Sequence, residues 1–222
     1  MKKNGFTLAE VLITLGIVGV VAAMTLPSLM TDTTAAQIGP KLSKAVSSFE
    51  QANQALLSDR GVDTLTDGGL IQDGTNYRDN LSRYLKGSSS SSGQAVLFTT
   101  KDGIAFNFAT LGGIHQNPAA VDANGPIPPH MQRIGSELII DINGWDTRPN
   151  LYGSDRFSFS LWNDGSLRPK GGTNWNGAAS SNPGGAEHWR NKCPANVTPS
   201  EAVGARYCAG HIFENNLKVL YK

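Results

Sequence analysis

Glu10 is the residue with the most distinctive chemistry, because it is the only charged residue in an apolar run that covers residues 6–26. At ~1.5 Å per residue, a helix of that length is about 30 Å long and matches the hydrocarbon core of a bilayer. An acid inside hydrocarbon costs roughly 2.5 to 3.5 kcal/mol even on insertion scales, so it requires a partner. The sequence therefore predicts a membrane-spanning helix whose single carboxylate has to be paired.

A second candidate site lies between residues 141 and 155. Carboxylate and amide oxygens repeat there at short spacings around a glycine, and Ca²⁺ takes such oxygens in sets of six to eight. The candidate metal ligands are Asp141, Asn143, Asp146 and Asp155. The segment lacks the closing glutamate of an EF-hand loop, and turns rich in Asp and Asn close on themselves without an ion. Two interpretations stay open, a calcium site and self-capping turns, and no other cofactor is expected.

Signatures of other chemistry are missing from the sequence. There is no G-x-S-x-G nucleophile motif, no H-E-x-x-H metal motif and no glycine-rich nucleotide-binding loop. The histidines His115 and His130 lie in segments rich in proline and asparagine, without evident acid partners. A net charge of +1 gives no basic surface for nucleic acid. We therefore expect neither an enzyme nor a nucleic-acid-binding protein.

The N-terminal segment KKNGFTLAEVLI, residues 2–13, closely resembles the signal of type IV prepilins and type II secretion pseudopilins. In that family a membrane peptidase cuts after the glycine and methylates the new N-terminus, which implies processing between Gly5 and Phe6. The acid of the family signal matches Glu10. The resemblance implies that the Phe6 amine of one subunit pairs with the Glu10 carboxylate of its neighbour, so that each offsets the other's desolvation cost.

Two simpler interpretations of the N-terminus are an ordinary secretory signal and a plain membrane anchor. Lys2, Lys3 and the apolar run fit a secretory signal, and Ala22-Ala23 would serve as a poor cleavage site. Glu10 counts against this interpretation, because a conventional signal keeps its apolar region free of acids. A plain anchor has no use for either Gly5 or Glu10.

Pro27 interrupts the apolar run. An interior proline removes one helical hydrogen bond and clashes with the carbonyl four residues earlier, so we expect either a kink near Ala23 or the end of the helix. Helical periodicity then resumes, and the regular helix is expected from Pro40. One apolar stripe is formed by Ile38, Leu42, Ala45, Phe49, Ala52 and Leu56.

The predicted organisation is a leader (1–5), a transmembrane and filament-core helix (6–30), an amphipathic second half of that helix (31–58) and one globular head (59–222). Within the head, residues 75–86 are expected to form a short helix and the serine-rich residues 87–93 a flexible loop. Strands are expected at residues 95–100, 104–110, 138–142 and 157–162, with turns at K-D-G and N-D-G. The fold class is therefore α+β, and the resemblance implies that the antiparallel sheet lies across the long helix.

The C-terminal part of the head is rich in loops and contains Cys193 and Cys208, the only cysteines. An even number of cysteines in an exported chain favours one disulfide over two free thiols. A helix over residues 199–215 and a last strand over 217–221 are also expected. The resemblance implies a disulfide-closed C-terminal region of the kind that many pilins use for subunit contacts.

The resemblance implies a structural subunit of a type IV pilus or a type II secretion pseudopilus. Its implied partners are copies of itself or other pilins, a prepilin peptidase and an inner-membrane assembly platform. Lys2 and Lys3 place the N-terminus in the cytoplasm by the positive-inside rule, so the head is outside it. The chain is thus expected in the inner membrane first and in a periplasmic or surface filament afterwards.

Two other functions remain open at this point. An adhesin or ligand-binding subunit at a filament tip would use the loops rich in glycine and tryptophan. An exported monomer with an ordinary signal would begin near Met24. The sequence does not distinguish a major from a minor subunit, a pilus from a pseudopilus, or adhesion, motility, DNA uptake and secretion from one another, and it leaves glycosylation of the serine run open.

Overall fold

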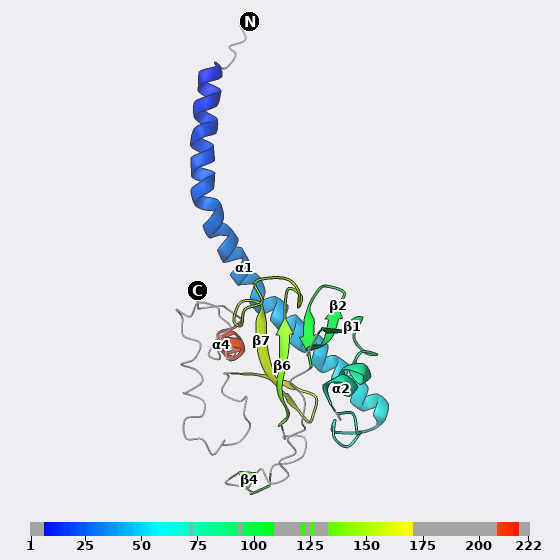
Figure 1. Cartoon of the computed structure of the whole chain (residues 1–222). Helices are drawn as coiled ribbons and strands as arrows, with labels where there is room; N and C mark the ends of the chain where they lie inside the picture. The colour runs from blue at the N-terminus through cyan, green and yellow to red at the C-terminus, as the bar shows by residue number, and fades with distance from the viewer. Residues whose placement is uncertain are drawn as a thin grey trace, which may run out of the picture. The chain divides into compact units, whose positions relative to one another are not determined.

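The computed structural model describes residues 7–71, 73–92, 95–108, 121–122, 125–126, 133–170 and 208–217 (Figure 1). The chain divides into two compact units, Met1–Gln37 and Ile38–Lys222. The first unit consists of the beginning of helix α1. Within the described residues, the second contains the remainder of α1, two shorter helices and the β-strands.

Helix α1 (Leu8–Arg60) is one element of 53 residues. Both Pro27 and Pro40 are interior to it, so the interpretation that Pro27 ends the membrane helix is wrong, as is the expectation that regular helix begins only at Pro40. The physical reason is that a proline removes a single backbone donor, while its fixed φ is itself helical. A kink at Pro27 stays a prediction.

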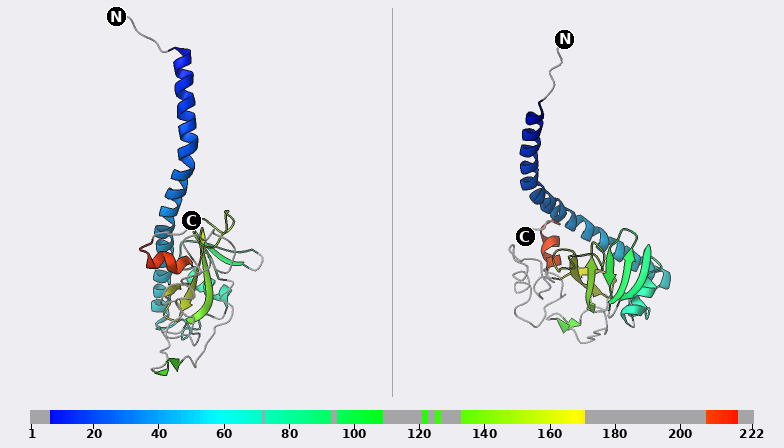
Figure 2. Two further views of the ribbon diagram at one scale, coloured as in Figure 1. Left: turned by 90° about the vertical axis from the view of Figure 1, so that its left-hand side faces the viewer. Right: turned by 45° about the horizontal axis from the view of Figure 1, so that its top comes forward.

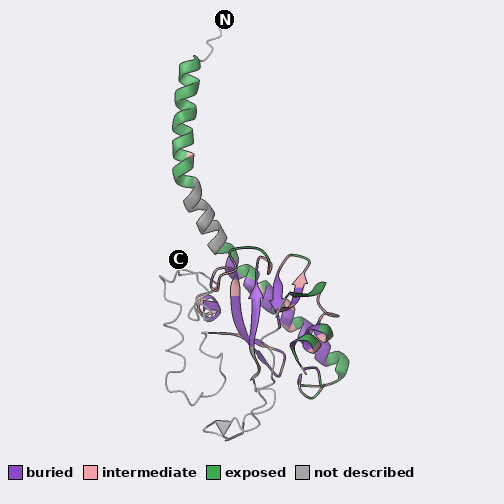
Figure 3. Ribbon diagram, in the orientation of Figure 1, coloured by how far each residue is buried: buried purple, intermediate pink, exposed green. Residues whose placement is uncertain are grey.

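At the beginning of α1, the segment Leu8–Thr25 exposes its apolar side chains (Figure 3). The segment Leu8–Thr25 has a mean hydropathy of 2.2 and none of its residues is buried, so it is long and apolar enough to cross a membrane. Leu8 and Met24 are 79% and 75% exposed. A helix that is apolar all round is stable only where hydrocarbon or other protein surrounds it.

In the second unit, α1 supplies one side of the hydrophobic core. All six residues of the predicted stripe are buried, from Ile38 to Leu56, which confirms the stripe. Phe49 is fully buried and packs 5.3 Å from the ring of Phe106 and 6.2 Å from that of Tyr77, measured between ring centroids. The views in Figure 2 show this part of α1 running along the sheet.

The sheet is antiparallel and has six strands in the order β1-β2-β3-β6-β7-β8, which confirms the α+β class. Its strands are β1 (Gly87–Ser92), β2 (Ala95–Thr100), β3 (Ala105–Asn107), β6 (Arg133–Asp141), β7 (Arg156–Trp162) and β8 (Leu167–Pro169). A separate two-stranded sheet is formed by β4 (Val121–Asp122) and β5 (Gly125–Pro126).

The predicted hairpins are present. Strand β2 coincides with its predicted bounds, and the turn into β3 contains Gly103 with a φ of +87°, a conformation that favours glycine. Gly165, with a φ of +81°, closes the predicted turn between β7 and β8. Strand β7 covers the predicted segment 157–162, whereas β6 begins earlier than predicted, at Arg133, and ends at Asp141, one residue before the predicted end. Strand β3 is shorter than the predicted 104–110 within the described residues.

The serine-rich run was predicted as a flexible loop, and this prediction is wrong: it forms the edge strand β1, which pairs with β2 along its whole length. An edge strand needs backbone hydrogen bonds and no apolar face. Serine side chains satisfy that requirement although their β propensity is low.

The described part of the second unit also contains two short helices. Helix α2 (Gly74–Leu81) begins at the N-cap Asp73, whose Oδ1 accepts the N–H of Asn76 at 2.8 Å. It ends earlier than predicted, but Tyr84 and Leu85 still pack against the core. Helix α4 (Cys208–Glu214) occupies part of the predicted C-terminal helix, whose first residues lie outside the described ones, as does the predicted last strand after Leu217.

Candidate functional site

The first turn of α1 is held by Thr7 and Glu10. The Oε2 atom of Glu10 accepts the backbone N–H of Thr7 at 2.8 Å and the Thr7 hydroxyl at 2.9 Å. In return, the backbone N–H of Glu10 donates to Oγ1 of Thr7 at 3.3 Å. This is a capping box, in which two side chains satisfy backbone donors that have no partner inside the helix. Sequence reasoning missed it, although Thr-x-x-Glu before an apolar run is its usual signal.

The capping box leaves part of the Glu10 carboxylate available. Both bonds from Thr7 reach Oε2, and Oε1 has no hydrogen-bond partner among the described residues. No basic side chain of the described part of the chain forms an ion pair with Glu10. The carboxylate can therefore keep its cap and still accept a donor from outside its own helix.

Two processing residues, Gly5 and Phe6, lie outside the described residues, and Pro27 is described only as part of the helical backbone. Processing, the assembly role of Glu10 and the kink therefore remain predictions. What the structure adds is the surroundings of Glu10, an exposed apolar helix with a capped start.

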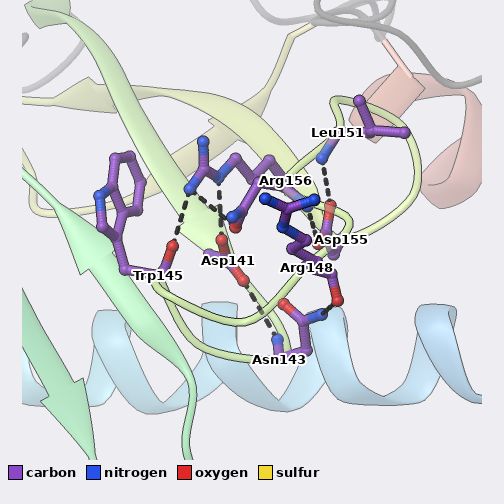
Figure 4. Close-up of polar contacts among 8 residues, drawn as sticks. Asp141, Asn143, Trp145, Arg148, Leu151, Asp155 and Arg156 are labelled. Atoms are coloured by element: carbon purple, nitrogen blue, oxygen red, sulfur yellow. Dashed lines mark hydrogen bonds and ion pairs between the residues drawn. The ribbon is translucent and has the colours of Figure 1, made fainter.

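The loop between β6 and β7 is organised around Arg156, which sequence reasoning missed (Figure 4). Its Nε donates to Oδ2 of the fully buried Asp141 at 2.9 Å. Its Nη2 donates to the carbonyl of Trp145 at 2.9 Å and to Oδ1 of Asn150 at 2.8 Å. The guanidinium also lies 4.0 Å from the centroid of the Trp145 ring. Arg156 thus lies at the centre of the acid-rich segment, where a calcium ion was considered.

The backbone N–H of Asn143 donates to Oδ1 of Asp141 at 3.2 Å, and the other predicted calcium ligands make separate contacts within the loop. Asp155 is buried and accepts the backbone N–H groups of Asn150 and Leu151 at 2.7 and 2.6 Å. The amide of Asn143 donates to the carbonyl of Arg148 at 3.2 Å, and its Oδ1 is buried without a hydrogen-bond partner among the described residues. Asp146 is exposed and makes none of these contacts.

Electrostatics at this loop favour a structural role. Burial raises the pKa of Asp141, and the hydrogen bond from Arg156 acts in the opposite direction. Within the described residues, no three acidic, histidine or cysteine side chains are grouped in a way that could hold a metal ion. The Arg156 guanidinium already offers Asp141 the positive charge that a calcium ion would bring. The contacts therefore favour self-capping turns, and the calcium interpretation stays a prediction. The signal that could have identified Arg156 is its position directly opposite Asp141 in the β6–β7 register.

Asn53 is a second polar residue that sequence reasoning missed. It lies on the core side of α1 and is fully buried. Its Oδ1 accepts the hydroxyl of Tyr77 at 2.6 Å, and its Nδ2 donates to the carbonyl of Gly165 at 2.8 Å. Asn53 therefore ties α1, α2 and the β7–β8 turn together.

Cys208 begins α4 and is fully buried, whereas Cys193 lies outside the described residues. The predicted disulfide between them consequently remains a prediction.

Comparison with known proteins gives one match. Residues 1–26 match the model of the prokaryotic N-terminal methylation motif, which is the signal of type IV pilins and pseudopilins, so the resemblance noted in the sequence is confirmed. No curated protein and no solved structure matches the chain.

Proposed function

We propose that this chain, which carries the type IV pilin signal at its N-terminus, is a structural subunit of a type IV pilus or a type II secretion pseudopilus. The observation that carries the proposal is the exposed apolar segment Leu8–Thr25 together with the single acid in its first turn. Such a segment requires hydrocarbon before assembly and neighbouring helices afterwards.

The proposed assembly begins with cleavage after Gly5 and methylation of Phe6. The new amine is cationic and one residue before Thr7, at the start of a helix that an acid already caps. In a filament, the free Oε1 of Glu10 accepts the Phe6 amine of a neighbouring subunit, and Oε2 keeps its bonds to Thr7. Pairing removes the cost of leaving either charge alone in an apolar surrounding.

The head is the part that the filament displays. The head belongs to the unit Ile38–Lys222, which has its own hydrophobic core between the second half of α1 and the sheet, so this unit can fold before and independently of assembly. We also propose that Cys193 and Cys208 form a disulfide that closes its C-terminal region. If alkylation of the native exported protein labels both thiols, the disulfide is excluded.

A minor subunit at a filament tip that binds a ligand is the second candidate. The two candidates differ in abundance, because a shaft subunit is present along the filament and a tip subunit is not. Affinity of the purified protein for a glycan or a host protein would favour the tip.

Shearing of cells tests the proposal. Filaments sheared from the surface, or the pseudopili formed when the subunit is overproduced, should contain the processed chain in quantity. A chain that is recovered only as a soluble periplasmic protein, or only from the membrane under conditions where filaments are made, would contradict it.

A further inference from the structure

We propose that the outer edge of β1 is a self-association surface, at which the head pairs edge to edge and antiparallel with β1 of a second copy of this chain. This goes beyond polymerisation through α1, because it concerns the head alone. The strand lies at one end of the six-stranded sheet, next to β2 (Figure 1), and its described side chains are exposed.

The hydrogen-bond pattern identifies the main-chain groups that point outward. The N–H of Lys101 donates to the carbonyl of Lys86 at 3.2 Å, so residues 86 and 101 form a hydrogen-bonded pair across the two strands. Such pairs alternate along an antiparallel ladder. Ser88 and Ser90 therefore bond to β2, while the N–H and C=O groups of Ser89 and Ser91 face away from the sheet. Among the described residues, these outward groups have no backbone partner.

The edge of β1 lacks the usual protection. Sheet edges are normally blocked by short strands, by proline, by charged side chains or by bulges. The opposite edge, β8, follows this rule, because it has three residues and ends at Pro169. Strand β1 has six residues in an unbroken register with β2, and it contains no proline and no charge.

Arg78 does not close this edge. Its Nη1 donates to the carbonyl of Ser90 at 3.0 Å, and that carbonyl belongs to the row that faces β2. The contact holds β1 in place from the side of α2, where Arg78 is nearly buried. The same Nη1 also donates to Oγ of Ser91 at 3.4 Å, which is a side-chain contact. Arg78 thus stabilises the strand, and the outward main-chain groups of Ser89 and Ser91 keep no backbone partner among the described residues.

The composition of β1 favours a second copy as the partner. A run of identical serines has the same side chains opposite each other in every register, so self-pairing does not depend on one particular register. Two uncharged strands also approach each other without repulsion. The Arg78 guanidinium, which contacts Ser90, is paired with Asp79 at 2.7 Å. The charge nearest in sequence, Lys86, precedes the strand, and in an antiparallel pair it lies beside the far end of the partner strand instead of beside the partner's Lys86.

The pairing rests on main-chain hydrogen bonds with little apolar area, so it is weak between free molecules and effective at high local concentration. Neighbouring heads of two filaments, or of two membrane-held subunits, provide such a concentration.

The experiment uses the full-length chain in detergent with a cysteine introduced at Ser90. When two β1 strands pair symmetrically about this residue, it lies opposite its own copy in a non-hydrogen-bonded pair, where side chains approach most closely. Mild oxidation should give a covalent dimer. The matched control places the cysteine at Thr75, which is exposed on α2 and away from the edge. We expect at least about tenfold less dimer for Thr75→Cys, and a similar loss when Ser91→Pro is added to Ser90→Cys, because proline removes outward hydrogen bonding.

Proline at position 91 removes an N–H that faces solvent, so the strand itself should stay intact. If Ser91→Pro nevertheless lowers the melting temperature, Ser88→Lys added to Ser90→Cys tests the pairing instead. It keeps every backbone N–H and places like charges along the paired edge. Equal dimer yields for the Ser90 and Thr75 cysteines, or a yield that neither Ser91→Pro nor Ser88→Lys lowers, would overturn the proposal.

Discussion

The hydroxyl of Tyr77 donates a 2.6 Å hydrogen bond to Oδ1 of Asn53, and both side chains are fully buried. The same Asn53 donates from Nδ2 to the carbonyl of Gly165. Gly165 itself allows this contact, because a Cβ at that position would lie 2.7 Å from the Cβ of Asn53. One amide thus fixes where α1, α2 and the turn after β7 meet.

Asn53→Ala should destabilise the head by about 2 to 4 kcal/mol, because it leaves the Tyr77 hydroxyl and the Gly165 carbonyl without partners in the core. The adjacent Gln54 is a matched control: it is exposed, although it donates to the carbonyl of Asp164 at 3.0 Å. Gln54→Ala should cost under about 1 kcal/mol, as surface changes do. Denaturant melts of the two variants give the comparison, and equal costs would show that Asn53 is dispensable.

Alkaline pH should weaken the fold through Tyr77. Burial raises the pKa of its hydroxyl, whereas the hydrogen bond to Asn53 lowers it by a smaller amount. Because the folded pKa is the higher one, this contribution to stability is complete below the ordinary tyrosine pKa of about 10 and is lost as the pH rises above it. Stability should fall more steeply above that pH in the wild type than in Tyr77→Phe, by up to about 1.4 kcal/mol per pH unit. Parallel pH profiles for the two proteins would refute this.

The ion pair of Asp141 and Arg156 should matter far more than that of Lys44 and Asp102. The side chain of Asp141 is completely buried, whereas those of Lys44 and Asp102 are 66% and 44% exposed. Arg156→Ala should therefore cost about 3 kcal/mol or more, and Lys44→Ala at most about 1 kcal/mol. Thermal melts of the two variants measure the difference.

Thermal melts of the wild type and of Asp141→Ala test calcium binding. Because Arg156 and backbone N–H groups already engage the oxygens of Asp141 and Asp155, the wild-type melting temperature should be equal in millimolar calcium and in chelator. A rise in calcium that Asp141→Ala abolishes would instead establish the predicted metal site.

Glu10→Ala should prevent assembly and leave folding and membrane insertion intact. Each subunit would then lack the counter-charge for its neighbour's Phe6 amine, and breaking a buried pair costs roughly 3 to 5 kcal/mol. Glu10→Gln should share much of the defect, because an amide keeps the cap and loses the charge. Thr7→Ala removes only one side of the capping box and should have a milder effect, about 1 kcal/mol on the helix. Filaments of normal number and length from Glu10→Ala subunits, counted without any wild-type copy, would refute the pairing.

Periodicity explains how much of the fold the sequence predicted. The stripe from Ile38 to Leu56 and the glycine turns at Gly103 and Gly165 are local signals, and all were confirmed. Strand β1 was missed because its stability comes from backbone pairing with β2, for which serine gives no local sign.

The polar residues of the site show the same limit. Arg156 and Asn53 were missed because their partners, Asp141 and Gly165, are distant in sequence and meet them only in the folded chain. The candidate calcium ligands are a local pattern, and two of them, Asp155 and Asp141, direct their oxygens to the backbone of their own loop and to Arg156, while the calcium site itself stays a prediction. At the N-terminus, by contrast, the whole signal is contiguous, so the motif could be identified from sequence alone, while the roles of Gly5, Phe6 and Glu10 stay predictions.

The mass of the mature N-terminal peptide tests the central claim most directly. If the chain is a type IV filament subunit, the peptide isolated from cells begins at Phe6 and carries one methyl group on its amine. A mature chain that begins near Met24, or one that keeps Met1 to Gly5 in cells with an active prepilin peptidase, would contradict it.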